Sequence, residues 1–284
     1  MEKYYRFAGL ELAVTPPPGQ DYEDDVTLAP FRVASVSDPH RFSFHMTEQL
    51  PQPAGPLLAQ LPDGAVYRAD RGQQRYVSAA GGSWENAAMC CFHRGKTHTV
   101  QLRQDRFPKG MTAKTFLNSC AAEHLLAREG GFVLHCSLIE FEGKAIAFTA
   151  PSGTGKSTQA NLWAKHQNAK ILNGDRAALR MTPEQPLAEG IPFSGSSRIC
   201  ENRSLPLEAI VYLTQAPENL CTRLTGARAF SRIWEGISVN TWDREDLEAV
   251  SHTLQQLLSA TAVYQLDCTP DEAAVAALLQ YIRK

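Results

Sequence analysis

This chain lacks an excess of charge of one sign, long apolar runs and paired cysteines. Its 28 Lys+Arg and 30 Asp+Glu residues give a formal net charge of −2, so no global basic field would attract nucleic acid or a membrane. No apolar run approaches the ~18 residues that a membrane-spanning helix needs. The first residues, Met1 to Arg6, contain no apolar segment typical of a signal peptide. We expect a cytoplasmic protein that binds neither nucleic acid nor membrane.

The seven cysteines of the chain contain no Cys-x-x-Cys pair. An odd number without that spacing favours a reducing cytosol over a disulfide framework or a zinc site. The length of 284 residues is sufficient for two domains. The cysteine pattern therefore agrees with the cytoplasmic location expected from the N-terminus.

Residues 1–108 are predicted to form the smaller of two domains, a β-rich α+β domain of undefined role. Alternating apolar and polar residues indicate strands at 41–46, 65–68, 75–78, 89–92 and 97–102, the last two forming a hairpin. The histidines of this part share no spacing typical of a metal site; they are His40, His45, His93 and His98. We expect them to have ordinary surface or core roles.

Residues 109–284 change to alternating strands and helices, which predicts an α/β domain. A helix capped by Thr112 and closed by Gly130 and Gly131 leads into it, so we place the domain boundary near residue 108. The strands are expected at 132–141, 145–150, 169–173, 209–214 and 263–266, and the later helices at 157–166, 246–260 and 270–283.

The stretch Ala150-Pro-Ser-Gly-Thr-Gly-Lys-Ser-Thr158 fits a loop that holds nucleotide phosphates. An apolar strand precedes it and a helix follows it, which is the structural context of this motif. Glycines let backbone N–H groups approach the phosphates, and the helix N-terminus adds partial positive charge. Ala150 replaces the usual first glycine, where a small residue is sufficient. We predict that ATP is bound by Ser152, Gly153, Thr154, Gly155, Lys156, Ser157 and Thr158.

Within this loop, Lys156 is expected to reach the β- and γ-phosphates, and the Ser157 hydroxyl to ligate Mg²⁺. Transporter-type ATPases carry a similar loop, and residues 193–197 vaguely match their signature segment. The later apolar strand, however, ends in Thr214-Gln215, where those ATPases need Asp-Glu to hold Mg²⁺ and polarise water. The transporter-type alternative is therefore disfavoured.

Two further segments resemble the HPr kinase/phosphorylase family. His135 begins His-Cys-Ser-Leu-Ile-Glu-Phe-Glu-Gly-Lys144, 21 positions ahead of Lys156, and Lys170-Ile-Leu-Asn-Gly-Asp175 delivers an acidic residue to the phosphates. The loop is also similar to that of ATP-dependent phosphoenolpyruvate carboxykinase, which shares that superfamily's fold. The resemblance covers roughly residues 130–215. It implies a P-loop nucleotide-binding domain with a mixed sheet, like the C-terminal domain of HPr kinase.

The resemblance also suggests roles for individual residues. Asp175 would accept the proton of an acceptor hydroxyl or bind Mg²⁺, and His135 would orient Asp175 or donate to the γ-phosphate. Arg198 is a candidate phosphate clamp because a guanidinium binds phosphate through two N–H groups. The chain departs from the family at Gly174, where the first of two aspartates is expected, and at Thr158, where glutamate is expected.

Other residues of the second half are candidates by position. Arg176 follows Asp175 and would face the phosphates or the interior. The acceptor pocket would be lined by Ser194, Gly195, Ser196 and Ser197.

These residues together lead us to expect an ATP- and Mg²⁺-dependent kinase. Its acceptor would be a hydroxyl, either a serine of a peptide or protein or a small hydroxylated metabolite. The catalytic residues would be Asp175, His135, Lys156 and Arg198, and the metal ligands Ser157 and Asp175. The N-terminal domain would recruit the acceptor, and the sequence leaves a homo-oligomer open.

Two alternatives remain. A non-catalytic module that senses ATP or GTP for a partner is suggested by Gly174 in place of an acid. A carboxykinase-like enzyme acting on a small carboxylic acid would need a Mn²⁺ site of Lys, His and Asp, which the sequence spacing does not supply.

Overall fold

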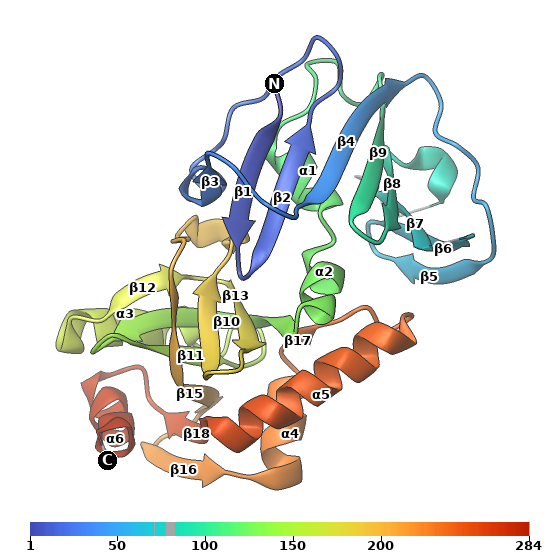
Figure 1. Cartoon of the computed structure of the whole chain (residues 1–284). Coiled ribbons are helices and arrows are strands. Elements are labelled where there is room, and N and C mark those ends of the chain that lie inside the picture. The colour runs from blue at the N-terminus through green and yellow to red at the C-terminus, as the bar shows by residue number, and fades with distance from the viewer. Residues whose placement is uncertain (71, 78–82, 284) are drawn as a thin grey trace. The chain divides into compact units, whose positions relative to one another are not determined.

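The computed structural model describes residues 1–70, 72–77 and 83–283 (Figure 1). The chain divides into two compact units, Met1–Ala121 and Ala122–Lys284. The strand predicted at 75–78 is found as part of β7 (Gly72–Val77), and its last expected residue, Ser78, lies outside the described residues.

The first unit is built on a nine-stranded sheet, as far as the described residues show (Figure 1). In spatial order the strands are β3 (Arg32–Val33), β1 (Lys3–Phe7), β2 (Leu10–Thr15), β4 (His40–Thr47), β9 (Thr97–Arg103), β8 (Met89–Arg94), β7, β6 (Gly64–Ala69) and β5 (Leu57–Leu61). The pairs β2–β4 and β4–β9 are parallel, and the other neighbours are antiparallel. The expected hairpin is confirmed, since β8 and β9 pair antiparallel with His93 opposite His98.

The helix expected as one element from Thr112 to Gly130 is divided. Thr112 caps α1 (Ala113–Ser119) as expected, but the chain turns at Ala121, with φ of 49°, before α2 (Ala122–Arg128). In α1, Phe116 stacks on Tyr5 with ring centroids 5.4 Å apart. This packing ties α1 to the first unit. The division therefore follows Ala121, whereas the sequence pattern placed it near residue 108.

Three of the four N-terminal histidines form a buried row, although the sequence showed no common spacing. His40 Nδ1 lies 3.1 Å from His98 Nε2, and His98 Nδ1 lies 3.1 Å from His93 Nδ1. Phe42 stacks on the ring of His98 at 4.3 Å. Both nitrogens of His98 thus face neighbouring imidazoles, which gives these three side chains a place in the core.

The second unit contains two sheets that share their longest strands, β10 (Gly131–Phe141) and β15 (Ser204–Gln215). One sheet has the order β12 (Lys170–Asn173), β10, β11 (Lys144–Thr149), β15, β18 (Ala262–Cys268), β16 (Leu220–Leu224). The other has the order β17 (Ile237–Ser238), β10, β13 (Arg176–Met181), β14 (Pro186–Gly190), β15. Because β11–β15 and β15–β18 are parallel and the rest antiparallel, the expected α/β class with a mixed sheet is confirmed.

Helices cover these sheets and enclose two apolar cores. The α3 helix (Lys156–Gln167) and the α6 helix (Glu272–Ile282) pack on one core, in which Trp163 is fully buried. Residues of α2, α4 (Gly226–Trp234) and α5 (Arg244–Ala260) form the other, against which Trp234 is partly buried. In the part of the chain that is described, no helix has the length and apolar character to cross a membrane.

Candidate nucleotide-binding site

The candidate site lies where strand β10 changes its neighbours. Up to His135 this strand pairs with β13, and from Cys136 onward it pairs with β11, whose last residue Thr149 lies opposite Cys136. The turn between β12 and β13 contacts β10 at this same point, because the Cys136 N–H donates to the Asp175 carbonyl at 3.0 Å. The divergence of the two sheets therefore places His135 and Asp175 beside the start of the 150–158 loop.

The 150–158 loop connects β11 to α3 through two glycines in the left-handed region. Gly153 has φ of 80° and Gly155 has φ of 120°, conformations that strain any L side chain. No atom lies within 4 Å of a Cβ placed on Gly153, so the space in front of this backbone is open. Ser157 and Thr158, in the first turn of α3, are exposed. The loop thus presents backbone and hydroxyl groups to solvent, as a phosphate cradle requires.

Lys156 folds back over this loop. Its Nζ donates to the carbonyls of Ala150 at 3.0 Å and Pro151 at 3.3 Å, and the residue is 8% exposed. Burial lowers the pKa of Lys156, while the neighbouring Cys136 and Asp175 side chains oppose this shift. A buried ammonium whose direct partners are neutral carbonyls favours an anion as an additional partner.

The Asp175 carboxylate lies between an imidazole and a guanidinium. His135 Nε2 is 3.4 Å from one carboxylate oxygen, and Arg176 Nε is 3.3 Å from the other. Burial and then the charge of Lys156 lower the pKa of His135, against the opposing effect of Asp175. The imidazole is consequently neutral at pH 7 and can both donate and accept a hydrogen bond.

Asn173 is a residue of this site that the sequence analysis missed. Its side chain is fully buried, and its Oδ1 accepts from the N–H groups of Asp175 at 2.9 Å and Arg176 at 3.0 Å. Its Nδ2 donates to the carbonyls of Ile191 at 2.9 Å and Phe193 at 3.3 Å. One amide therefore holds the Asp175 turn against the segment that follows β14. Asparagine ahead of Gly-Asp is a turn signal that could have identified it.

The predicted acceptor loop lies against the Asp175 turn through η3 (Gly195–Ser197). A Cβ added to Gly195, which has φ of 57°, would lie 2.8 Å from Asp175 Cγ. Ser194 is buried, and the side chain of Ser196 lies outside what the structure describes. Arg198 is exposed with φ of 53°, and its guanidinium has no hydrogen bond or ion pair with the described residues. The backbone of this loop, but not the Arg198 guanidinium, is thus joined to the predicted site.

The two predicted metal ligands are oxygen donors of the kind Mg²⁺ prefers. The Ser157 hydroxyl is exposed at the start of α3, and the Asp175 side chain is 31% exposed. Two protein oxygens fit a Mg²⁺ ion that is bound mainly by substrate phosphates and water.

A second group of potential ligands, His124, Asp243 and Asp246, brings its ligand atoms within 4.8 Å of one another. Arg128 already contacts both carboxylates, with Nε 3.1 Å from Asp246 and Nη2 3.6 Å from Asp243. Asn240 also donates to the buried Asp246 at 2.9 Å. The Arg128 guanidinium supplies the positive charge that a bound metal ion would otherwise supply. This group is therefore an ion-pair network that joins α2 to α5.

Comparisons with known proteins place the chain in a family. The family described as "SynChlorMet cassette protein ScmC" matches residues 116–266, which is more than half of the chain and contains His135, the 150–158 loop and Asp175. No curated protein matches the chain. The solved structure of the Hpr(Ser) kinase/phosphatase from Coxiella burnetii is similar at 9% identity and a TM-score of 0.32, over 53% of this chain and 95% of that one. A likeness of that degree does not define a function. On the family match, the chain belongs to the ScmC family.

Proposed function

We propose that this protein is an ATP- and Mg²⁺-dependent kinase that transfers the γ-phosphoryl group to a hydroxyl acceptor. The acceptor is a serine of a peptide or protein, or a small hydroxylated metabolite. One observation carries the proposal: His135 and Asp175 lie 3.4 Å apart beside a glycine-rich loop that ends in a buried lysine. The seven free cysteines suit a reducing cytoplasm as the place of action.

Phosphoryl transfer has a loose transition state whose charge is spread over the phosphoryl oxygens, so the protein mainly positions groups and neutralises charge. In this proposal the amides of residues 153–158 and the Lys156 ammonium hold the phosphates. Ser157 would hold Mg²⁺, with Asp175 reaching the ion through a water molecule, and the ion when bound would supply further positive charge. Arg198 has no protein partner among the described residues, so its guanidinium is available to a phosphate.

The acceptor hydroxyl would lie beside Asp175, which takes its proton. His135 is neutral at pH 7 because burial and Lys156 lower its pKa, so it can donate one hydrogen bond to the carboxylate and keep it oriented. Arg176 contacts the second carboxylate oxygen at 3.3 Å and restricts the same group from the other side. This arrangement supports a base that is held in position.

A non-catalytic nucleotide sensor is the second candidate, favoured by Gly174 because the Asp175 turn holds a single acid. The first unit would recruit the acceptor in the first case and a partner in the second.

Two assays separate the candidates. Calorimetry would measure binding of ATP with Mg²⁺, and labelled ATP would report transfer to serine peptides and small hydroxylated compounds. We expect Lys156→Ala to weaken ATP binding by about 100-fold, because a charged hydrogen-bonding group is worth ~3 kcal/mol in such a site. Lys165→Ala, an exposed lysine of the same helix, is the matched control.

Asp175→Asn distinguishes the two functions. For a kinase, this variant retains ATP binding within a few-fold but loses transfer by about 100-fold or more. A sensor would bind ATP normally, show no transfer in the wild type and be unaffected by the substitution. Absence of ATP binding by the wild-type protein would refute both.

A further inference from the structure

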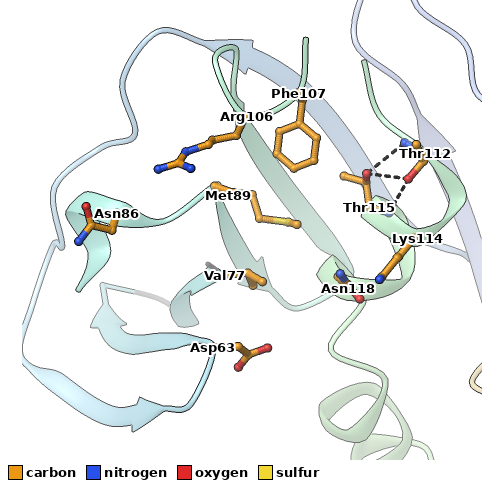
Figure 2. Close-up of a pocket in the computed structure, with 11 residues that line it drawn as sticks. Asp63, Val77, Asn86, Met89, Arg106, Phe107, Thr112, Lys114, Thr115 and Asn118 are labelled. Atoms are coloured by element: carbon orange, nitrogen blue, oxygen red, sulfur yellow. Dashed lines mark hydrogen bonds between the residues drawn. The ribbon is translucent and has the colours of Figure 1, made fainter. Parts of the chain in front are cut away.

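A cavity of about 740 Å³ lies within the first unit. Its walls come from β7, β8, the turn between β5 and β6, the chain after β9, η2 (Trp84–Asn86) and α1 (Figure 2). This volume is in the range of sites for small organic molecules, ~300–1,000 Å³. None of the roles proposed above uses this cavity.

The centre of the cavity is apolar. Val77, Met89 and Phe107 come from three different segments, and Figure 2 shows their side chains grouped around the open space. Met89 is 3% exposed, so it forms a packed floor, whereas Phe107 is only partly buried. These three side chains offer a surface for an apolar or aromatic body.

Cationic and amide groups line the α1 side. Lys114 and Asn118 are four residues apart on α1 and therefore share one face of that helix. Neither side chain has a hydrogen bond or ion pair with the described residues. Figure 2 draws a second cation, Arg106, on the other side of Met89 and Phe107 from Lys114, and Arg106 forms an exposed ion pair with Asp105 at 3.8 Å. Among the described residues, no acidic side chain therefore neutralises the Lys114 ammonium at the α1 wall.

One lining residue carries negative charge. Asp63, in the turn between β5 and β6, is the one carboxylate among the described lining residues, and Figure 2 places it across the cavity from Arg106. An acid group would be attracted to the Lys114 wall, while a second acid group at the other end would be repelled by Asp63.

We infer that this cavity binds a small organic acid with one negative charge. Its apolar body lies on Met89 and Phe107, and its acid group lies beside Lys114 with Asn118 available as a hydrogen-bond donor. A dianion with its charges at opposite ends is selected against by Asp63. The inference does not depend on the proposed kinase activity.

Two fluorescent probes with the same rings test the charge preference in the full-length protein. Anilinonaphthalene sulfonate carries one negative charge, and phenylnaphthylamine is the neutral compound without the sulfonate. We expect the sulfonate to bind about three- to tenfold more tightly, the range expected of a partly desolvated ion pair. Lys114→Gln should remove this preference and leave the affinity of the neutral probe unchanged.

Lys109→Gln is the matched control, because Lys109 is an exposed lysine just ahead of α1 that does not line the cavity. It should change neither affinity. The wild type should bind a naphthalene disulfonate more weakly than the monosulfonate. Asp63→Asn should bind that disulfonate more tightly than the wild type does. Equal sulfonate affinity in the wild type and Lys114→Gln would overturn the inference, as would an equal loss for both probes in that variant.

Discussion

A Cβ placed on Gly174 would lie 2.4 Å from the Oγ of Ser197 and 2.9 Å from its Cβ. Ser197 is itself held, because its hydroxyl donates to the Ser194 carbonyl at 2.8 Å. An aspartate was expected at this position from the sequence resemblance, and the structure leaves little room for any side chain there because η3 approaches it closely. Asp175 is therefore the one acid of the Asn173-Gly-Asp175 turn.

This contact predicts that Gly174→Ala destabilises the protein by about 1–3 kcal/mol, the usual cost of forcing extra atoms into a packed region. Ser197→Gly removes both clashing atoms, so the double variant should recover most of the loss. Urea unfolding of the wild type, both single variants and the double variant measures the coupling between the two positions. If the changes in unfolding free energy of the two single variants summed to that of the double variant, the two residues would not interact.

Asn173→Ala should loosen the turn that carries Asp175. The substitution removes four hydrogen bonds between the buried amide and the backbone around it, and we expect a loss of about 2–4 kcal/mol in the free energy of unfolding. Since the 150–158 loop is not bonded to Asn173, ATP affinity should change less than the rate of phosphoryl transfer. Calorimetry measures the ATP affinity of the variant, and the labelled-ATP assay measures its rate of transfer. If ATP affinity fell as much as the rate of transfer, Asn173 would not act on the Asp175 turn alone.

The lowered pKa of His135 predicts a pH dependence of stability. Below pH ~6.5 the unfolded imidazole binds a proton that the folded one resists, so the unfolded state binds more protons and stability falls as pH falls. His135→Gln removes this contribution and should reduce the difference between urea midpoints at about pH 7.5 and about pH 5.5. His252→Gln, at an exposed position of α5, is the control. If the two urea midpoints of His135→Gln differed as much as those of the wild type, His135 would not be the source of this pH dependence.

The interpretation of Asp246 as a structural acid makes a prediction about metal. Asp246→Ala removes the partner of His124, Arg128 and Asn240 and should cost about 2–4 kcal/mol of stability, because these groups lose a buried charge. Glu245→Gln changes only an exposed ion pair of Arg128 and should cost less than ~1 kcal/mol. The midpoint of thermal unfolding should be the same in the presence of a chelator as in the presence of added Zn²⁺ or Mg²⁺. A metal-dependent rise that Asp246→Ala abolishes would show instead that the group binds an ion.

Local sequence signals located much of the second unit. The elements around the 150–158 loop appear within one or two residues of their predicted bounds, because strand, glycines and helix follow one another in the chain. The Thr112 cap is also local and is confirmed. The last helix shows the limit of such signals, since Asp271 caps α6 and the helix begins at Glu272, whereas its start was predicted at residue 270.

Several other features depended on tertiary contacts. The strands β13 and β14 and the helix α4 were not predicted. The strand β13 pairs with the distant β10, and α4 packs in a core with residues from distant strands, whereas β14 forms a local hairpin with β13. His40 and His98 meet across 58 positions, which no spacing rule detects. Cys120 and Ala121 end a helix that the apolar pattern would have continued, because Phe116 packs within the first unit.

The sequence by itself determined which residues form the 150–158 loop between β11 and α3, because their chemistry and backbone freedom are local properties. Only the tertiary structure decided what lies beside that loop. The branching of β10 brings His135 to Asp175, Asn173 fixes the turn, and Ser197 occupies the space next to Gly174. These relationships arise from strand pairing and close packing between segments that are separated in the chain. Local sequence patterns do not predict such contacts.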